Sequence, residues 1–445
     1  MNIPSRTVLP NWPSYVPHGW EVLRLKWLVL SVESGVSVNA TNESAAAGEL
    51  GVLKTSAVAG GIFFPYENKA VWDSETDRVM CPVRCDTVIM SRMNTPSLVA
   101  ESGYVDRNHP DLFLPDRLWQ ITFDPKRVFT PFMAKVLACS GARSTLSEMA
   151  TGTSGSMKNL TQEDMLNLPV PLPPLALQRI IADYLDWETS RLDSLVVAKE
   201  RVLGLLAEKR RALITRAVTR GLDPNAPLRD SSIPWLGEIP AHWELIPLRF
   251  LVDIVGGATP DTGKAEFWDG DIPWVSPKDM KRDEIEDAED HVTRLALTSS
   301  ALRLIEPGAV LIVVRGMILA HSFPTAVTTQ TVTINQDMKA LRCRASLQPR
   351  FLRGFFRGTE TQVVSLADAS AHGTRKLETE VLGRFEVCVP PLEEQRAIVA
   401  HIEKETAKLD ALREATERTI GLLKERRAAL IAAAVTGKIQ VPSAP

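Results

Sequence analysis

PPLALQRIIADYLDWETSRLDSLVVAKERVLGLLAEKRRALITRAVT, residues 173–219, decides the fold, because the chain contains this stretch twice. A constant offset of 217 residues lays it without a gap on residues 390–436, and 25 of the 47 aligned positions are identical. Prolines in the first turn of a helix sacrifice no backbone hydrogen bond, so the Pro-Pro pair that opens each copy predicts a helix start. The repeat therefore predicts two long helices of one design.

Apolar residues in both copies recur at the spacing of a coiled-coil seam. About 45 residues at ~1.5 Å per residue give a rod of roughly 65 Å. A helix with a single apolar stripe needs a partner, and we expect the two copies to partner each other. The predicted seam residues are Leu185, Leu192, Leu195, Val202, Leu206 and Leu213 in the first copy, and Ile402, Leu409, Leu412, Leu423 and Leu430 in the second.

The duplication extends beyond the helix. Trp20 and Glu21 recur as Trp243 and Glu244 at an offset of 223, and the same offset carries the strand-like run 87–92 onto 310–315. Short β-rich runs set off by Gly, Pro, Asn and Asp predict mixed α/β globular segments. We therefore predict an α+β chain with a pseudo-twofold internal repeat. Its globular segments span residues 1–155 and 223–372, and its helical regions span 156–222 and 373–445.

Bulk composition narrows the class of protein. The net charge of −3 argues against nucleic-acid binding through a bulk positive field, although it permits local basic patches. The sequence has no run of 18 apolar residues and no signal-peptide pattern at its start, so we expect a cytoplasmic protein without a membrane partner. The five cysteines are scattered, which predicts buried free thiols and no metal site.

No catalytic constellation is found in the sequence. Gly256-Gly257 lacks the rest of a dinucleotide-binding glycine pattern, and the chain has neither a P-loop nor the Asn/Asp-Pro-Pro-aromatic loop of amino-methyltransferases. The carboxylate run between Asp283 and Asp290 fits no spacing rule for calcium or magnesium, and a solvated acidic face is the simpler reading. We therefore predict no catalytic residues and no cofactor held by the chain itself.

A polar, glycine-containing loop with cations precedes each Pro-Pro pair, at residues 151–160 and 370–377, and Lys158 aligns with Arg375. Backbone and hydroxyl donors beside a cation suit phosphate binding, while the alternative is an ordinary solvated loop. Arginines at the strand ends are suited to reading guanine, and a structural ion pair is the alternative. The candidate DNA-binding residues are Lys158, Arg375, Lys376, Arg92, Arg315, Asn94, Ser276, Lys278, Thr153 and Thr374; Arg107, Asn108, Arg117, Lys281, Arg282 and Gln330 are weaker surface candidates.

Four features together resemble the specificity (S) subunit of type I restriction–modification systems: the opening Pro-x-x-Trp-Glu-x-x-x-Leu, the segment GGATPDTGKAEFWDGDIPWVSPKDMK, the segment VIMSRMNTPSLVAESG, and the two Pro-Pro-Leu-x-x-Gln-Arg helices. The resemblance implies two target recognition domains, each reading one half of a split, asymmetric DNA site. It also implies that the two helices pair antiparallel as a spacer.

The same resemblance implies partners. They are double-stranded DNA, adenine methyltransferase (M) subunits, two in number, and restriction (R) motor-nuclease subunits, which use S-adenosylmethionine, ATP and magnesium. The residues it suggests for docking are Gln178 and Arg179, with Gln395 and Arg396, beside the seam leucines. Ala176-Leu177 stands where the second copy has Glu393-Glu394, so the two docking surfaces are expected to differ. A stand-alone DNA-modifying enzyme and a purely structural coiled-coil adaptor are the alternative functions.

Overall fold

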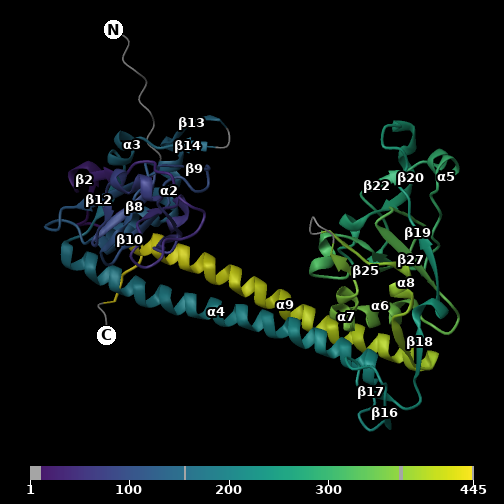
Figure 1. The fold of residues 1–445 in the computed structure, drawn as a ribbon. Coiled ribbons are helices and arrows are strands. Elements are labelled where there is room, and N and C mark those ends of the chain that lie inside the picture. The colour runs from purple at the N-terminus through teal and green to yellow at the C-terminus, as the bar shows by residue number, and fades with distance from the viewer. Residues whose placement is uncertain (1–11, 155–156, 370–373, 443–445) are drawn as a thin grey trace. The chain divides into compact units, whose positions relative to one another are not determined.

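The computed structural model describes residues 12–154, 157–369 and 374–442, and the chain divides into two compact units. The first unit comprises residues 1–200 with 418–445, and the second comprises residues 201–417. Each unit contains a head of short strands and helices together with part of each long helix, α4 (Leu175–Arg220) and α9 (Leu392–Val435) (Figure 1). The predicted α+β architecture with an internal repeat is confirmed.

The first head is built on a six-stranded sheet whose central strand β8 is buried along its whole length. Its order is β2 (Val29–Ser34), β12 (Leu118–Phe123), β8 (Thr87–Ser91), β10 (Ser102–Val105), β5 (Gly61–Phe63) and β4 (Val58–Ala59). The smaller sheets are β6 (Asn68–Ala70), β3 (Gly51–Leu53), β11 (His109–Phe113) and β7 (Pro82–Val83); β13 (Thr151–Ser154), β14 (Met157–Asn159) and β9 (Met93–Asn94); and β1 (Glu21–Arg24) with β15 (Pro169–Leu172). The helices are α1 (Thr130–Ala138), α2 (Ser140–Met149) and α3 (Gln162–Leu166).

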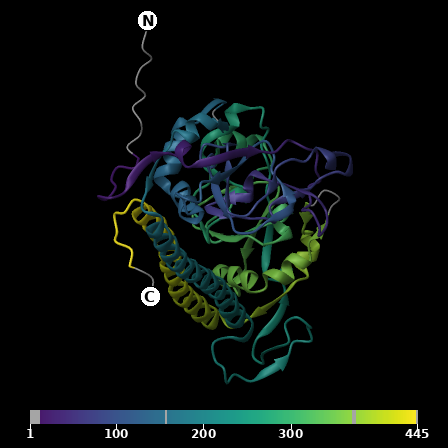
Figure 2. The ribbon, with the colours of Figure 1, turned by 90° about the vertical axis from the view of Figure 1, so that its left-hand side faces the viewer.

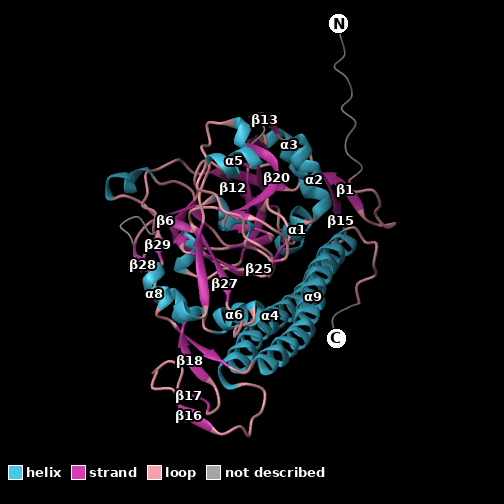
Figure 3. Cartoon of the chain, turned by 90° about the vertical axis from the view of Figure 1, so that its right-hand side faces the viewer, coloured by secondary structure: helices cyan, strands magenta, loops and turns pink. Residues whose placement is uncertain are grey.

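The second head repeats this plan around the buried strand β23. The neighbours of β23, strands β25 and β27, are labelled in Figure 3. Its main sheet has the order β19 (Val252–Gly256), β27 (Met338–Cys343), β23 (Val310–Val313), β25 (Thr325–Thr328) and β21 (Glu284–Ile285). The smaller sheets are β22 (Asp290–Val292), β20 (Trp268–Val275) and β26 (Thr333–Ile334); β24 (Arg315–Gly316), β29 (Arg375–Lys376) and β28 (Asp368–Ala369); β18 (Glu244–Pro247) with β30 (Glu386–Val389); and β16 (Leu228–Asp230) with β17 (Glu238–Pro240). The helices are α5 (Arg294–Ser299), α6 (Pro349–Gly358), α7 (Glu360–Ser365) and α8 (Thr379–Gly383).

Within each unit α4 and α9 run side by side in opposite directions, as the two views in Figures 1 and 2 agree. In the first unit Arg427 Nε lies 2.9 Å from Asp193 Oδ1, and in the second Arg210 Nε lies 3.6 Å from Asp410 Oδ1. The offset of 217 turns each of these ion pairs into the other. The two copies of the repeated helix therefore partner each other, antiparallel and with twofold-related contacts.

The seam between the helices differs from the predicted one at two leucines. Leu192 and Leu409 are buried as predicted, but Leu195 is 44% exposed and Leu412 is 55% exposed, so both lie outside the seam. Val196, four residues after Leu192, is half-buried. An apolar side chain alone does not show which face of the helix is covered. The half-buried leucines Leu206, Leu213, Leu423 and Leu430 keep their predicted places, whereas Val202 is exposed.

The ends of both helices belong to the cores of the heads. Ile181 and Leu185 of α4 pack in the first core together with Val435 of α9. At the equivalent positions of the second core lie Ile398, Ile402 and Val218. Burying each of these side chains stabilises the fold by about 1.5–3 kcal/mol, so each head is fixed to the start of one long helix and the end of the other.

A glycine follows the end of each long helix, and the two glycines lie one residue apart in the alignment of the repeat. Gly221 has φ +72° and Gly437 has φ +69°, the left-handed conformation that ends a helix without strain only for glycine. A Cβ on Gly221 would lie 3.2 Å from the indole of Trp243, and one on Gly437 would lie 3.1 Å from that of Trp20. The repeated tryptophans therefore pack against the repeated helix stops.

The predicted domain boundaries at 155/156 and 372/373 lie outside the described residues and stay a prediction. The predicted boundary at 222/223 lies just after Gly221, which follows α4, and it also stays a prediction. Among the described residues, no helix is both long and apolar enough to cross a membrane.

The five cysteines are free, and only Cys85 is exposed, so the expectation of buried thiols is wrong for that residue. Burial raises the pKa of Cys343 and of Cys388 to about 12 and that of Cys139 to about 11. A thiol reacts as its thiolate, so at pH 8 we expect one fast-reacting cysteine, Cys85, and slow reaction at the buried ones. Counting thiols with a chromogenic disulfide reagent in native and denaturing buffer checks this. Rapid modification of Cys388 in the folded chain would contradict it.

Candidate nucleic-acid interface

A small three-stranded sheet in each head joins the predicted cation loop to the end of the central strand. In the first head Lys158 of β14 pairs in register with Asn94 of β9. In the second head Lys376 and Arg375 of β29 pair with Arg315 and Gly316 of β24. The structure thus brings together most of the residues that the sequence marked as candidates for DNA binding.

The backbone register corrects one predicted equivalence by a single residue. Leu160 N–H donates to the carbonyl of Arg92 (2.8 Å), and its counterpart Leu377 donates to the carbonyl of Val314 (2.8 Å). Val314 therefore occupies the position of Arg92, and Arg315 lies one residue further on. Successive side chains of a strand point to opposite faces, so the two strand-end arginines serve different surfaces.

The two arginines also differ in exposure. Arg92 is half-buried, with its guanidinium carbon 6.0 Å from the centre of the Trp119 ring, a cation–π arrangement. Arg315 is exposed at the edge of its sheet. Of the two, Arg315 is available to a ligand in solution, whereas Arg92 supports the first head internally.

The cations of the loops are positioned by neighbouring groups. Lys158 is half-buried, and its Nζ donates to the carbonyl of Ser147 at the end of α2 (2.6 Å). Lys376 is exposed and pairs with Glu378 (2.6 Å). Arg375 is half-buried in β29. Exposed ion pairs of this kind contribute at most about 1 kcal/mol, so a phosphate can compete for such a lysine.

Parts of the two loops, Gly155-Ser156 and residues 370–373, lie outside the described residues. Thr153 lies in β13, and Thr374 comes immediately before β29. Asn94 lies in β9, and its Oδ1 accepts from the backbone N–H of the next residue, Thr95 (2.9 Å).

Ser276 and Lys278 have internal partners. Ser276 is buried and forms a capping box with Asp279 at a short 3₁₀ turn. Lys278 Nζ lies 2.9 Å from Asp290 and 3.3 Å from Glu289, and the hydrogen bond to Asp290 raises the pKa of the lysine. Both candidates therefore make contacts within the second head. Their place in DNA binding stays a prediction.

The glutamines named as docking candidates are fully buried, and their place in docking stays a prediction. Gln178 Oε1 accepts from Phe129 N–H (2.8 Å), and its amide donates to the carbonyls of Arg127 and Pro173 (both 2.9 Å). Gln395 repeats the set with Gln348, Ser346 and Pro390. Each glutamine fastens the start of its long helix to the segment before α1 or α6.

The neighbouring arginines remain exposed. Arg179 lies over the ring of Phe129, 4.6 Å from its centre, and Arg396 pairs with Glu393 on its own helix. The difference between Ala176-Leu177 and Glu393-Glu394 is explained by contacts within each head. Glu394 Oε2 accepts from the indole N–H of Trp243 (3.1 Å), whereas Leu177 packs on the first core.

Sequence reasoning missed a cluster of charges on α6. Asp283 binds Arg353 (3.0 Å) and Arg357 (2.7 Å), while Glu284 binds Arg350. Burial lowers the pKa of Arg353, and the charge of Asp283 opposes this shift. The acidic run predicted to be solvated is therefore partly engaged in ion pairs, and the arginine spacing of three and four residues was the signal that could have revealed it.

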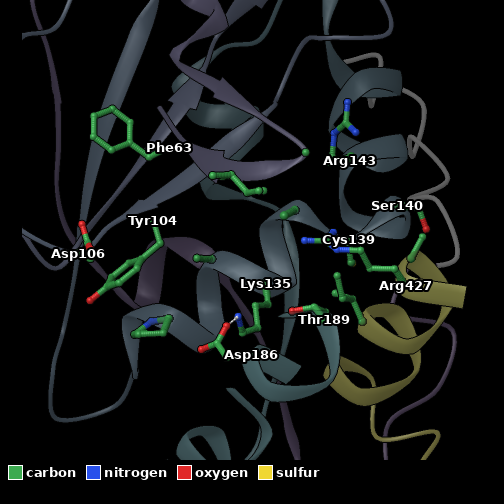
Figure 4. A pocket seen from close by; sticks show the side chains of 18 of the residues that line it. Phe63, Tyr104, Asp106, Lys135, Cys139, Ser140, Arg143, Asp186, Thr189 and Arg427 are labelled. Carbon is green, nitrogen blue, oxygen red and sulfur yellow. Dashed lines mark hydrogen bonds and ion pairs between the residues drawn. The ribbon is translucent and has the colours of Figure 1, made fainter. Parts of the chain in front are cut away.

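The equivalent surface of α1 carries small residues instead. Pro131, Ala134 and Ala138 line a cavity of about 630 Å³ in the first unit, together with Gly60 and Gly61. Figure 4 shows this cavity from close by. Figure 4 also shows Lys135 of the cavity wall paired with Asp186. The first unit thus has small residues on α1 and at Gly60-Gly61, and a cavity lies beside them. The second unit has arginines on α6 and carboxylates at Asp283 and Glu284 in the corresponding positions.

Replacing Asp283 with asparagine is expected to destabilise the second unit by about 2 kcal/mol, because Arg353 is largely buried and loses its counter-charge. Urea unfolding monitored by tryptophan fluorescence measures this change. The matched control is Asp253→Asn, which breaks an exposed pair with Arg344 and is expected to cost less than about 1 kcal/mol. Equal losses in both variants would show that burial of Arg353 adds nothing.

The described residues contain no group of three or more His, Cys, Asp or Glu side chains arranged to hold a metal ion. The weaker candidates Arg107 and Asn108 lie at the start of β11, where Asn108 Oδ1 accepts from Cys85 N–H (2.8 Å). Lys281, Arg282 and Gln330 lie in loops of the second head, and Arg117 precedes β12.

These features define a class: a duplicated chain whose two α/β heads are borne on paired long helices, with a cation-carrying sheet in each head. Residues 240–420 match the family model described as "Type I restriction modification DNA specificity domain". This match, with the relatives below, supports the resemblance deduced from the sequence.

Two curated relatives carry this similarity. The chain is 31% identical over 172 residues to the type I restriction enzyme EcoR124I/EcoR124II specificity subunit of Escherichia coli, which covers 38% of this chain and 43% of the relative. It is 30% identical over 167 residues to the MjaIX specificity subunit of Methanocaldococcus jannaschii, covering 37% and 38%. The aligned regions thus span less than half the length of these relatives.

Two solved structures share the fold over nearly the whole chain. One, described as "Structural basis underlying complex assembly and conformational transition of the type I R-M system", has a TM-score of 0.75 at 20% identity and covers 96% of this chain and 100% of that one. The HsdS subunit from Thermoanaerobacter tengcongensis has a TM-score of 0.56 at 21% identity, with the same coverage. At these identities the likeness supports the fold alone.

Proposed function

We propose that this chain is the DNA-recognition subunit of a type I restriction–modification complex and that each head reads one half of a split, asymmetric DNA site. The observation that carries the proposal is the small sheet that recurs in both heads and holds Lys158 in one and Arg375 with Arg315 in the other. Cations on matched sheets provide phosphate contacts, whereas sequence is read by groups that differ between the heads.

The paired helices support a spacing role. Both helices pass from one compact unit into the other, so their length is the element of the chain suited to setting the separation of the two half-sites. Two readers that approach the same face of a duplex lie about 34 Å apart, one helical turn.

The chemistry of the complex belongs, in this proposal, to other subunits. Two adenine methyltransferase subunits would supply S-adenosylmethionine-dependent methylation, and restriction subunits would supply ATP- and magnesium-dependent cleavage. The chain itself acts without a cofactor and as a non-catalytic subunit.

Replacing Lys158 and Arg375 together with glutamine is expected to weaken binding to all DNA sequences alike. Each phosphate contact that is lost lowers the slope of log affinity against log salt by about 0.9, so the double variant should lose close to 2 in slope. Fluorescence anisotropy of a labelled duplex at several salt concentrations measures this. Lys404→Gln, at an exposed position of α9, is the control and should leave the slope unchanged.

The same experiment separates the alternatives. An unchanged salt slope in the double variant would favour a structural coiled-coil adaptor. Methylation or cleavage of DNA by the isolated chain with S-adenosylmethionine or magnesium would instead favour a stand-alone enzyme.

A further inference from the structure

An exposed aromatic ring occupies the same place in both heads. Trp27 is 64% exposed and Phe250 is 55% exposed, and the offset of 223 that relates the start of the two halves relates these residues. Each ends a 3₁₀ turn, η1 (Leu25–Trp27) after β1 or η4 (Leu248–Phe250) after β18. A large ring that is left in water contributes little to the stability of the fold.

The local backbone holds each ring outward. Leu25 and Leu28 on either side of Trp27 are buried, and Leu28 N–H donates to the carbonyl of Leu25 (2.9 Å). In the second head Leu248 and Leu251 flank the phenylalanine in the same way, with the same hydrogen bond (2.9 Å). Turning either ring inward would expose a buried leucine, so the rings are preorganised for contact with something outside the chain.

A cation accompanies each ring. Lys26 Nζ lies 5.4 Å from the centre of the Trp27 ring, and the guanidinium of Arg249 lies 4.8 Å from that of Phe250. A second cation binds the backbone beneath. Arg127 donates to the carbonyl of Trp27 (3.3 Å), and Arg344 donates to the carbonyl of Phe250 (3.2 Å). We call each set of one ring and two cations a ring–cation surface.

Both ring–cation surfaces adjoin the start of a long helix. The carbonyl of Arg127 accepts from the buried Gln178 of α4, and in the second head the carbonyl of Ser346, two residues after Arg344, accepts from Gln395 of α9. The surfaces are thus fixed to the same part of the repeated framework in each unit.

The ring–cation surface is the same in both heads, which distinguishes it from the groups that would read DNA bases. Heads that read two different half-sites need different base-reading groups, and the strand-end arginines Arg92 and Arg315 do occupy different positions. An exposed feature that both heads keep serves a ligand that is the same for both. Aromatic rings beside arginines are the usual hot spots of protein–protein interfaces.

We propose that the two ring–cation surfaces each bind one copy of the same protein partner, through an apolar recess for the ring and an acidic group for the cation over the ring, Lys26 or Arg249. Arg127 and Arg344 pair with Glu21 and Asp253 of their own heads and hold the turn beneath each ring. This inference rests on the proposed function, in which two identical methyltransferase subunits attach to one recognition subunit. It adds where on the heads each copy is held, at Trp27 and at Phe250.

The test measures how many methyltransferase subunits the full chain binds, by native mass spectrometry and light scattering. The wild-type chain should bind two copies, Trp27→Ala and Phe250→Ala one tight copy each, and the double variant none at the same concentrations. Truncating a hot-spot ring should weaken its own site at least about 30-fold. Trp72→Ala removes a ring that is 50% exposed but has no place in the ring–cation surfaces, and it should still bind two copies.

DNA binding, measured in parallel, separates the possible failures. Two copies bound to the double variant with unchanged affinity would overturn the inference and leave the proposed function standing. A double variant that keeps both partner copies but loses DNA affinity would overturn it too and assign the surfaces to DNA. A wild-type chain that binds neither partner nor DNA would overturn the proposed function itself.

Discussion

Replacing Gln178 with alanine is expected to destabilise the first unit by about 3 kcal/mol, the largest effect of any single polar substitution that the structure suggests. The side chain is fully buried and satisfies one backbone N–H and two carbonyls. Alanine leaves all three groups without their partner and opens a space at the start of α4. Urea unfolding followed by circular dichroism measures the loss.

The repeat provides a matched pair of tests. Gln395→Ala should destabilise the second unit by a similar amount, because its three hydrogen bonds are the same. Arg179→Ala, one residue further on an exposed face, should cost less than about 1 kcal/mol. If Gln178→Ala were as mild as Arg179→Ala, the joint between head and helix would not depend on this glutamine.

Inserting seven residues after Arg201 in α4 and seven after Arg418 in α9 is expected to widen the unspecified gap of the DNA site. A heptad in each helix preserves the antiparallel seam and lengthens the pair by about 10.5 Å. Since base pairs stack at ~3.4 Å, the preferred gap should grow by about three base pairs. The two half-site sequences should stay the same.

Band-shift titration of duplexes that differ only in gap length measures this change. An insertion in α4 alone is the control. It shifts the two helices out of register, so that the ion pairs Arg427–Asp193 and Arg210–Asp410 cannot both form. It should weaken binding at every gap length. A variant with both insertions that still prefers the original gap would show that the helices do not set the spacing.

Much of the fold was predictable because the sequence contains an internal repeat. The two helices, their pairing and the repeated strands follow from alignment of the chain with itself, and the structure confirms them. The seam is the exception. Leu192 and Leu195 are equally apolar, and only the covering helix decides that the first is buried and the second exposed.

The candidate site was predictable in outline but not in detail. The cation loops and the strand ends were each named as candidates, and the structure pairs them in one small sheet in each head. The hydrogen-bond register, which no single sequence displays, shifts Arg315 by one position from Arg92. Gln178 was recognised as a repeated residue and named as a docking candidate, because polarity alone does not reveal three buried backbone partners. The arginines of α6 were missed because their acidic partners come from a loop about 70 residues earlier in the chain.

The most direct test of the account is selection of DNA by the purified chain together with its methyltransferase subunits. A pool of random duplexes is bound, recovered and sequenced through several rounds. The account predicts two fixed half-sites of different sequence separated by a gap of constant length and free sequence. A single continuous motif, or no enrichment over the starting pool, would contradict the claim that the two heads read a split DNA site.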